Sequence, residues 1–208
     1  ALNNTWNVSL TGLLVGTDGV TLTDTFRNEG HGISLYVSNN NLIGDGTLEG
    51  ANVISGNGLD GLYISEFISQ GNIIDYNFIG SNADGTAAIG NGGTGINLEN
   101  SPTATEIRSN VISGNALHGV SISGTAAFNN VLTANRIGTT ADGMGAMGNG
   151  GDGVRLGPGV SFNNIGSDVA GAANVISGNA NDGIFIDGDS TSNNLVLGNL
   201  IGTNVNGD

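Results

Sequence analysis

The feature that most constrains this chain is an internal repeat. The hexapeptide NVISGN occurs three times, at Asn52–Asn57, Asn110–Asn115 and Asn174–Asn179. A second element follows each copy and reads NFIGSNADG from Asn77, NRIGTTADG from Asn135 and NLIGTNVNG from Asn199. The copies begin at 52, 110 and 174, so the period is 58 and then 64 residues. Self-similarity at such a period is typical of solenoids, whose units bury their apolar faces by stacking on one another.

Each repeat also carries short strand signatures. A glycine is followed by an apolar, a variable and a second apolar residue, with apolar pairs such as Leu62 and Ile64, Val120 and Ile122, and Val154 and Leu156. Alternation with a period of two places both apolar residues on one side of a strand and the middle residue on the other. Strands this short bury too little surface alone, so the coils that carry them must stack.

The spacing predicts an all-β, right-handed parallel β-helix that forms one domain over residues 1–208. We expect about eight coils, in which coils of roughly 20 residues alternate with coils of roughly 38. Residues 1–29 are degenerate first coils, and residues 30–208 form regular coils with a supra-repeat of 58–64 residues. The pattern indicates no helix that would cap either end.

Asparagines recur with the repeat and predict stacked columns at tight bends. One column is expected to contain Asn52, Asn72, Asn110, Asn174 and Asn194. A second column, five residues further on, is expected to contain Asn57, Asn77, Asn115, Asn135, Asn179 and Asn199. Asparagine tolerates left-handed backbone conformations, and its amide can satisfy backbone groups that the sheets leave free. Glycines such as Gly56 and Gly114 are expected at positive φ.

The charge balance excludes several partners. The chain has 18 acidic and 4 basic residues, a net charge of −14, and no cysteine. Nucleic acid and anionic membrane surfaces are disfavoured, because little in the chain neutralises phosphate. No apolar run reaches the roughly 18 residues of a membrane span. Disulfides and cysteine-ligated metals are excluded.

The repeated pattern NVISGN-xxx-G(I/V)xI, followed by NxIGTxxxG and GNxxxGVxL, resembles a known group of sequences. It is similar to the right-handed parallel β-helix repeat regions of large bacterial secreted and cell-surface proteins, within the pectate-lyase-like superfamily. The resemblance covers the chain from about Gly30 onward. It implies an extracellular solenoid that is often adhesive or structural. Several relatives of the same fold cleave or epimerise acidic polysaccharides.

Stacking would bring chemically active residues into columns beside the strands that begin with glycine. The residue before that glycine reads, in order, His31, Asp60, Thr94, His118, Asp152 and Asp182. The outward residue two positions after it reads Ser34, Tyr63, Asn97, Ser121, Arg155 and Phe185. His118, Asp152, Arg155 and Asp182 are therefore expected in one patch, which would suit acid–base chemistry on a polysaccharide. The simpler interpretation is that these residues are solvated turn positions, and no catalytic or cofactor-binding residue is assigned.

Two other kinds of site are open, a calcium site and a carbohydrate-binding platform. The strong negative charge leaves incidental Ca²⁺ binding open near Asp45, Asp168 or Asp187 with Asp189. A calcium roll is disfavoured, because Asn97 and Arg155 stand where that motif needs Asp. A carbohydrate-binding adhesin would need an exposed aromatic platform, for which the candidates are Trp6, Tyr63, Phe67, Tyr76 and Phe185.

The ends of the chain suggest stacking of whole molecules. Ala1, Leu2 and Asn4 align with Ala88, Ile89 and Asn91, so the start of the chain resumes where its last repeat leaves off. The main hypothesis is thus a non-enzymatic structural protein, extracellular or at the cell surface. It would stack head to tail into a filament or form the shaft of an adhesin, with extracellular polysaccharide as a further partner. The alternative is a lyase or hydrolase on acidic glycans, or a carbohydrate-binding adhesin module.

Overall fold

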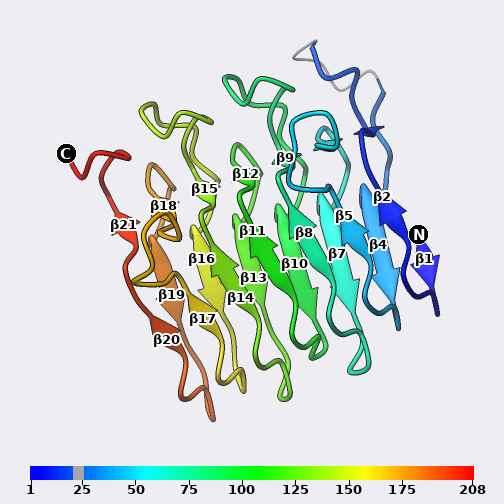
Figure 1. Cartoon of the computed structure of the whole chain (residues 1–208), viewed down its shortest axis with the longest axis vertical. Coiled ribbons are helices and arrows are strands. Elements are labelled where there is room, and N and C mark those ends of the chain that lie inside the picture. Colours follow the sequence, from blue (N-terminus) through cyan, green and yellow to red (C-terminus); the bar gives the residue numbers. More distant parts are fainter. Residues whose placement is uncertain (21–25) are drawn as a thin grey trace.

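The computed structural model describes residues 1–20 and 26–208 as a rod of three parallel sheets, with the two termini at opposite ends (Figure 1). Sheet 1 contains β1 (Leu2–Asn3), β4 (Ile33–Tyr36), β7 (Leu62–Ser65), β10 (Ile96–Glu99), β13 (Val120–Ile122), β16 (Val154–Leu156) and β19 (Ile184–Ile186). Sheet 2 contains β2 (Ser9–Leu10), β5 (Leu42–Ile43), β8 (Ile73–Asp75), β11 (Glu106–Arg108), β14 (Val131–Thr133), β17 (Asn164–Ile165) and β20 (Leu195–Val196). Sheet 3 contains β3 (Leu14–Val15), β6 (Val53–Ile54), β9 (Phe78–Ile79), β12 (Val111–Ile112), β15 (Arg136–Ile137), β18 (Val175–Ile176) and β21 (Leu200–Ile201).

The predicted right-handed parallel β-helix is confirmed, with differences in the number and length of its coils. Each sheet has 7 strands, so the described residues form seven coils rather than about eight. The difference arises at the start, where the described residues among 1–29 supply β1, β2 and β3 and thus a single coil. Equivalent bend residues are separated by 24 residues between Asn91 and Asn115 and by 34 between Asn115 and Asn149. The coils are therefore closer to one another in length than the expected 20 and 38.

The interior of the rod is filled by the inward residues of the three sheets. Leu62, Ile64, Ile96 and Leu98 of sheet 1 are fully buried, as are their counterparts Ile74 and Ile107 in sheet 2 and Ile79 and Ile112 in sheet 3. The parallel register aligns Leu62 with Ile96 and Ile64 with Leu98, so each apolar residue packs on its equivalent in the next coil. This stack is the hydrophobic core that single coils lack.

Three ladders of asparagine run along the rod, one at each bend. Their members are Asn41, Asn72, Asn130, Asn163 and Asn194 between sheets 1 and 2, Asn52, Asn77, Asn110, Asn135, Asn174 and Asn199 between sheets 2 and 3, and Asn57, Asn91, Asn115, Asn149 and Asn179 between sheets 3 and 1. In each rung the side-chain N–H donates to Oδ1 of the next asparagine, as from Asn77 to Asn110 at 2.9 Å. The two predicted columns were therefore wrong: Asn52 and Asn77 share a ladder, because the five-residue spacing separates successive bends and not successive coils.

Sheet 3 is covered by its own connections. Long excursions leave the coil at the bend after β9 and β15 and fold back on themselves through antiparallel bridges between Ser81 and Ala88 and between Thr139 and Ala146. They project along one edge of the rod (Figure 1). A second apolar cluster of Val53, Phe78, Val111 and Met147 lies beneath them. The outward side of this sheet is thus not open along its length.

The first coil corrects the expected alignment of the ends. Leu2 pairs with Leu35 in sheet 1, and Leu10 pairs with Ile43 in sheet 2. Leu2 therefore occupies the inward position of Leu98, not the position of Ile89. The sequence alignment of the two ends therefore does not define which strands would pair if Asp208 of one chain were followed by Ala1 of another. In residues 1–20 and 26–208 no helix occurs, and hence none that could cross a membrane.

Candidate functional site

The outward face of sheet 1 is the surface where the predicted columns lie. The register pairs Ser34 with Tyr63, Tyr63 with Asn97, Asn97 with Ser121, Ser121 with Arg155 and Arg155 with Phe185. Backbone hydrogen bonds from the strand-opening glycines align the second column, as from Gly119 N–H to the Asp152 carbonyl at 3.0 Å. Two groups of polar and aromatic side chains form on this face, which we name the Arg155 cluster and the Tyr63 cluster.

The Arg155 cluster consists of His118, Asp152, Arg155 and Phe185. Nδ1 of His118 lies 3.2 Å from Oδ2 of Asp152, and Arg155 donates to the same oxygen at 3.3 Å. The guanidinium carbon of Arg155 lies 4.6 Å from the centre of the Phe185 ring. Only 4% of the Asp152 side chain is exposed, against 35% for Arg155. The carboxylate is therefore a buried anchor that orients a partly exposed guanidinium.

The sequence-predicted patch is thus brought together, with one difference. Asp182 joins it through its backbone, whose N–H donates to Oδ1 of Asp152 at 3.3 Å, while its side chain is exposed. The carboxylate of Asp152 therefore receives hydrogen bonds on both oxygens. Phe185 completes the group by stacking on Arg155. The order of the outward column predicts that these two residues are neighbours, but not that their side chains stack.

The imidazole of His118 has a defined hydrogen-bonding state. The backbone N–H of Asp152 donates to Nδ1 of His118 at 3.0 Å, so the neutral ring carries its proton on Nε2. Burial lowers the pKa of His118, and Arg155 lowers it further, against the opposing effect of Asp152. Moving the proton to Nδ1 would replace the bond from the backbone by one to the nearby carboxylate and free Nε2 as a base.

The Tyr63 cluster consists of His31, Asp60, Tyr63, Asn97 and Glu99. It repeats the same His–Asp arrangement: Nδ1 of His31 lies 3.3 Å from Oδ2 of Asp60 and accepts from the Asp60 backbone at 3.2 Å. Asn97 donates to Asp60 at 3.1 Å. The hydroxyl of Tyr63 donates to Glu99 at 2.5 Å. Burial and this hydrogen bond raise the pKa of Tyr63 to about 12.

The aromatic candidates do not gather on one surface. His31 stacks on the ring of Tyr63 with centroids 4.5 Å apart, and Arg155 covers one face of Phe185. Trp6 and Phe67 are exposed, at 53% and 62%, but lie at the bend between sheets 1 and 2. The rings on the sheet 1 face therefore act as packed partners of polar groups.

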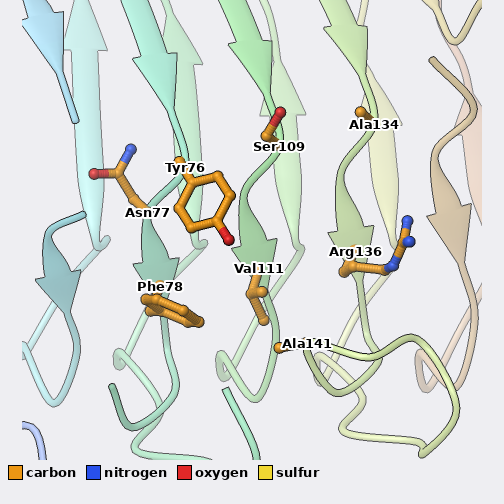
Figure 2. A pocket seen from close by; sticks show the side chains of 8 residues that line it. All are labelled: Tyr76, Asn77, Phe78, Ser109, Val111, Ala134, Arg136 and Ala141. Carbon is orange, nitrogen blue, oxygen red and sulfur yellow. The ribbon is translucent and has the colours of Figure 1, made fainter. Parts of the chain in front are cut away.

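A pocket of about 190 Å³ lies over sheet 3, between Tyr76, Phe78, Val111 and Arg136 (Figure 2). Its charged side chain is Arg136, whose guanidinium is turned away from the Tyr76 ring in Figure 2. Nε of Arg136 is buried without a hydrogen-bond partner. The lining of this pocket mixes apolar side chains with the polar residues Asn77 and Ser109, and it holds no imidazole–carboxylate pair like those of the sheet 1 clusters.

Among the aspartates named for calcium, Asp45 is held by local hydrogen bonds. The carboxylate of Asp45 accepts from the backbone and hydroxyl of Thr47 at 2.9 and 2.7 Å, and these bonds lower its pKa. Within the described ranges, 1–20 and 26–208, no group of three or more His, Asp or Glu side chains is placed to hold a metal ion. Calcium binding by the chain stays a prediction.

The fold and the face define a right-handed parallel β-helix with a polar outer sheet. No family model matches the sequence, and no curated protein matches it. Among solved structures, the chain is similar to mutants of the periplasmic alginate epimerase AlgG. One single mutant aligns with a TM-score of 0.57 at 15% identity, covering 94% of this chain and 46% of the other, and a double mutant with a TM-score of 0.54 at 16% identity, covering 94% and 47%.

This comparison corrects the expectation of a non-enzymatic protein. The solved structures that share the fold over nearly the whole chain are those of an enzyme, an alginate epimerase. At 15% identity the likeness shows the fold, and the chain spans about half the length of the structures it matches. Any activity of the chain is therefore a proposal, and it must be argued from the residues of this chain.

Proposed function

We propose that the chain is the β-helix module of an exported enzyme that acts on a carboxylated polysaccharide, which binds on the outward face of sheet 1. The observation that carries the proposal is the Arg155 cluster, where a guanidinium and an imidazole share one buried carboxylate. The fold of an alginate epimerase supports the choice of substrate class.

The chemistry of this cluster suits proton transfer beside a carboxylate. Arg155 uses one N–H on Asp152 at 3.3 Å and retains further donors for a carboxylate of the substrate. Pairing with the guanidinium would offset the negative charge of that carboxylate and make the neighbouring C–H more acidic. His118 would remove the proton of that C–H bond, since its Nε2 becomes a base when Nδ1 is protonated beside Asp152.

Hydrogen–deuterium exchange at carbon tests the proposal. The full chain is incubated in D2O with oligomers of mannuronate, guluronate, glucuronate or galacturonate, or with a hyaluronan oligomer, in which glucuronate alternates with an uncharged sugar. Carbon-bound deuterium is measured by NMR and mass spectrometry. Both epimerisation and elimination begin by removing the proton next to the carboxylate. Reprotonation from D2O places deuterium on that carbon, whereas elimination leaves an unsaturated uronate without it. Deuterium incorporation or an unsaturated product in at least one oligomer is therefore the expected result. His118→Gln and Arg155→Gln should each reduce the rate about 100-fold or more.

Arg108→Gln is the matched control. Arg108 lies on sheet 2, where it pairs with Asp75 at 2.9 Å and Glu106 at 2.7 Å, away from the sheet 1 face. This variant should keep the wild-type rate. Absence of both deuterium incorporation and unsaturated product in every oligomer, or equal loss in the Arg108 variant, would contradict the proposal.

A further inference from the structure

The sheet 1 face carries two clusters of matching geometry and different charge, and we infer that it selects a glycan in which a carboxylated sugar and an uncharged sugar lie about 14 Å apart. This inference rests on the proposed function and narrows its substrate class. The glycan would lie along the rod, with its carboxylated sugar at the Arg155 cluster and its uncharged sugar at the Tyr63 cluster.

The clusters are equivalent in the repeat. His31 and His118 occupy the same column, and each accepts from the backbone N–H of an aspartate in the next coil, at 3.2 and 3.0 Å. The two imidazole–carboxylate distances are 3.3 and 3.2 Å. Three coils separate corresponding residues, which at ~4.8 Å per coil gives about 14 Å.

Their charges differ at the positions that a ligand would meet. The Arg155 cluster presents a guanidinium that is 35% exposed. The Tyr63 cluster combines the carboxylates of Asp60 and Glu99 with the amide of Asn97 and the phenol of Tyr63. Among the described residues, no ion pair to an arginine is formed by either carboxylate. A substrate carboxylate placed there would meet the like charge of Glu99, with that of the largely buried Asp60 nearby, whereas sugar hydroxyls would find hydrogen-bonding partners.

No charged residue of the outward column lies between Tyr63 and Arg155. The clusters occupy adjacent coils, and the column residues of β10 and β13 that belong to neither cluster, Thr94 and Ser121, are small and polar. Each sugar of an extended chain advances by about as much as one coil. In a glycan of alternating uronate and uncharged sugars, residues three apart are of opposite kind, which matches the two clusters. A uniform polyuronate would place one carboxylate at the Tyr63 cluster.

Calorimetric binding to three oligosaccharides of equal length tests the inference. The probes are a hyaluronan oligomer, in which glucuronate alternates with N-acetylglucosamine, a uniform glucuronate oligomer, and a chitin oligomer. We expect the alternating probe to bind at least about tenfold more tightly than either of the others. Glu99→Gln should raise affinity for the uniform oligomer several-fold, and Arg155→Gln should abolish the preference for the alternating probe over chitin.

The outcomes separate the inference from the proposed function. Equal binding of the alternating and uniform oligomers, with no effect of Glu99→Gln, would overturn the inference and leave an enzyme on carboxylated glycans standing. Failure of all carboxylated probes to bind would contradict both. Glu99→Gln keeps an oxygen to accept from Tyr63, and a tyrosine titration that shows the Tyr63 pKa falling from about 12 confirms that the variant is folded and altered at this site.

Discussion

At the scale of single residues, the asparagine side chains link one coil to the next. Asn110 accepts from the backbone and side chain of Asn77 on one Oδ1, both at 2.9 Å. It donates to the Ile74 carbonyl at 2.9 Å and to Asn135 at 3.1 Å. All these atoms are buried, so each bond is made where water is absent. The asparagine amides therefore link successive coils at the bends, as backbone hydrogen bonds link successive strands in the sheets.

Replacing Asn110 by alanine should strongly destabilise the rod. Two donors of Asn77 would lose their acceptor, at about 1–3 kcal/mol for each buried group left unpaired. Thr105 is the contrasting position, because it interrupts the first ladder and its Oγ1 is buried without a partner. Thr105→Asn should stabilise the chain by about 1 kcal/mol. Urea unfolding of both variants checks the two signs, and a neutral Asn110→Ala would contradict the account of the ladders.

The protonation of His118 should make stability depend on pH. Its pKa is lowered in the folded chain, mainly by burial, so the unfolded chain binds a proton first as pH falls below the ordinary value of 6.5. Stability should therefore be level above 6.5 and decrease below it. His118→Gln keeps an acceptor for the Asp152 N–H and should flatten this decrease. Denaturation midpoints across this range check it, and an unchanged slope in the variant would show that other groups cause the effect.

At the scale of elements, the glycines before the strands of sheet 1 set how closely the coils approach. A Cβ on Gly119 would lie 2.6 Å from the carbonyl oxygen of Gly153 and 2.6 Å from Ile137 Cγ2. A Cβ on Gly95 would lie 2.5 Å from Ile112 Cγ2. These positions are glycine because backbone and side chains of the adjacent elements occupy the space.

Gly119→Ala should therefore cost about 1–3 kcal/mol, since the added carbon forces the next coil to shift. Gly30→Ala is the matched control, because nothing lies within 4 Å of a Cβ at that position. Thermal unfolding of the two variants should separate them by several degrees. Equal melting temperatures would show that the coils adapt to the added carbon without cost.

The same elements show what could be predicted from sequence. Alternation of apolar residues predicted sheet 1 and its outward column, because a period of two is local in the chain. The positive φ of Gly56 and Gly114, +72° and +76°, also follows from their place at the bend that begins after each strand of sheet 3. The separation of the asparagines into three ladders was missed, since it depends on which bends coincide in space. Contacts such as Tyr63 with Glu99 and Arg155 with Phe185 depend on side-chain conformation and needed the structure.

At the scale of the whole molecule, the rod exposes strand edges and apolar side chains at its ends. Ile186 and Ile201 of the last coil are 48% and 46% exposed. Head-to-tail stacking of chains stays a prediction. It would extend the sheets, but Val8 and Leu13 of the first coil stand where other coils carry asparagine, and their N–H groups donate to Asn41 and Asn52. Two of the three ladders would therefore break at the junction.

Restoring those rungs should strengthen stacking. In a Val8→Asn, Leu13→Asn double variant, the new side chains would offer acceptors to Asn194 and Asn199 of the adjoining chain, as rungs do within the rod. Electron microscopy at micromolar concentration should then show longer rods than the wild type gives. Single rods of one length in both preparations would contradict head-to-tail assembly.

The most direct test of the central claim is to map where a carboxylated glycan binds. Amide NMR spectra of the isotope-labelled chain are recorded during titration with an oligouronate or a hyaluronan oligomer. We expect the largest shifts at His118, Asp152, Arg155 and their neighbours in β13 and β16, with little change at Arg108 of sheet 2. Shifts confined to sheet 2 or to the pocket beside Tyr76, with none on sheet 1, would contradict the assignment of this face.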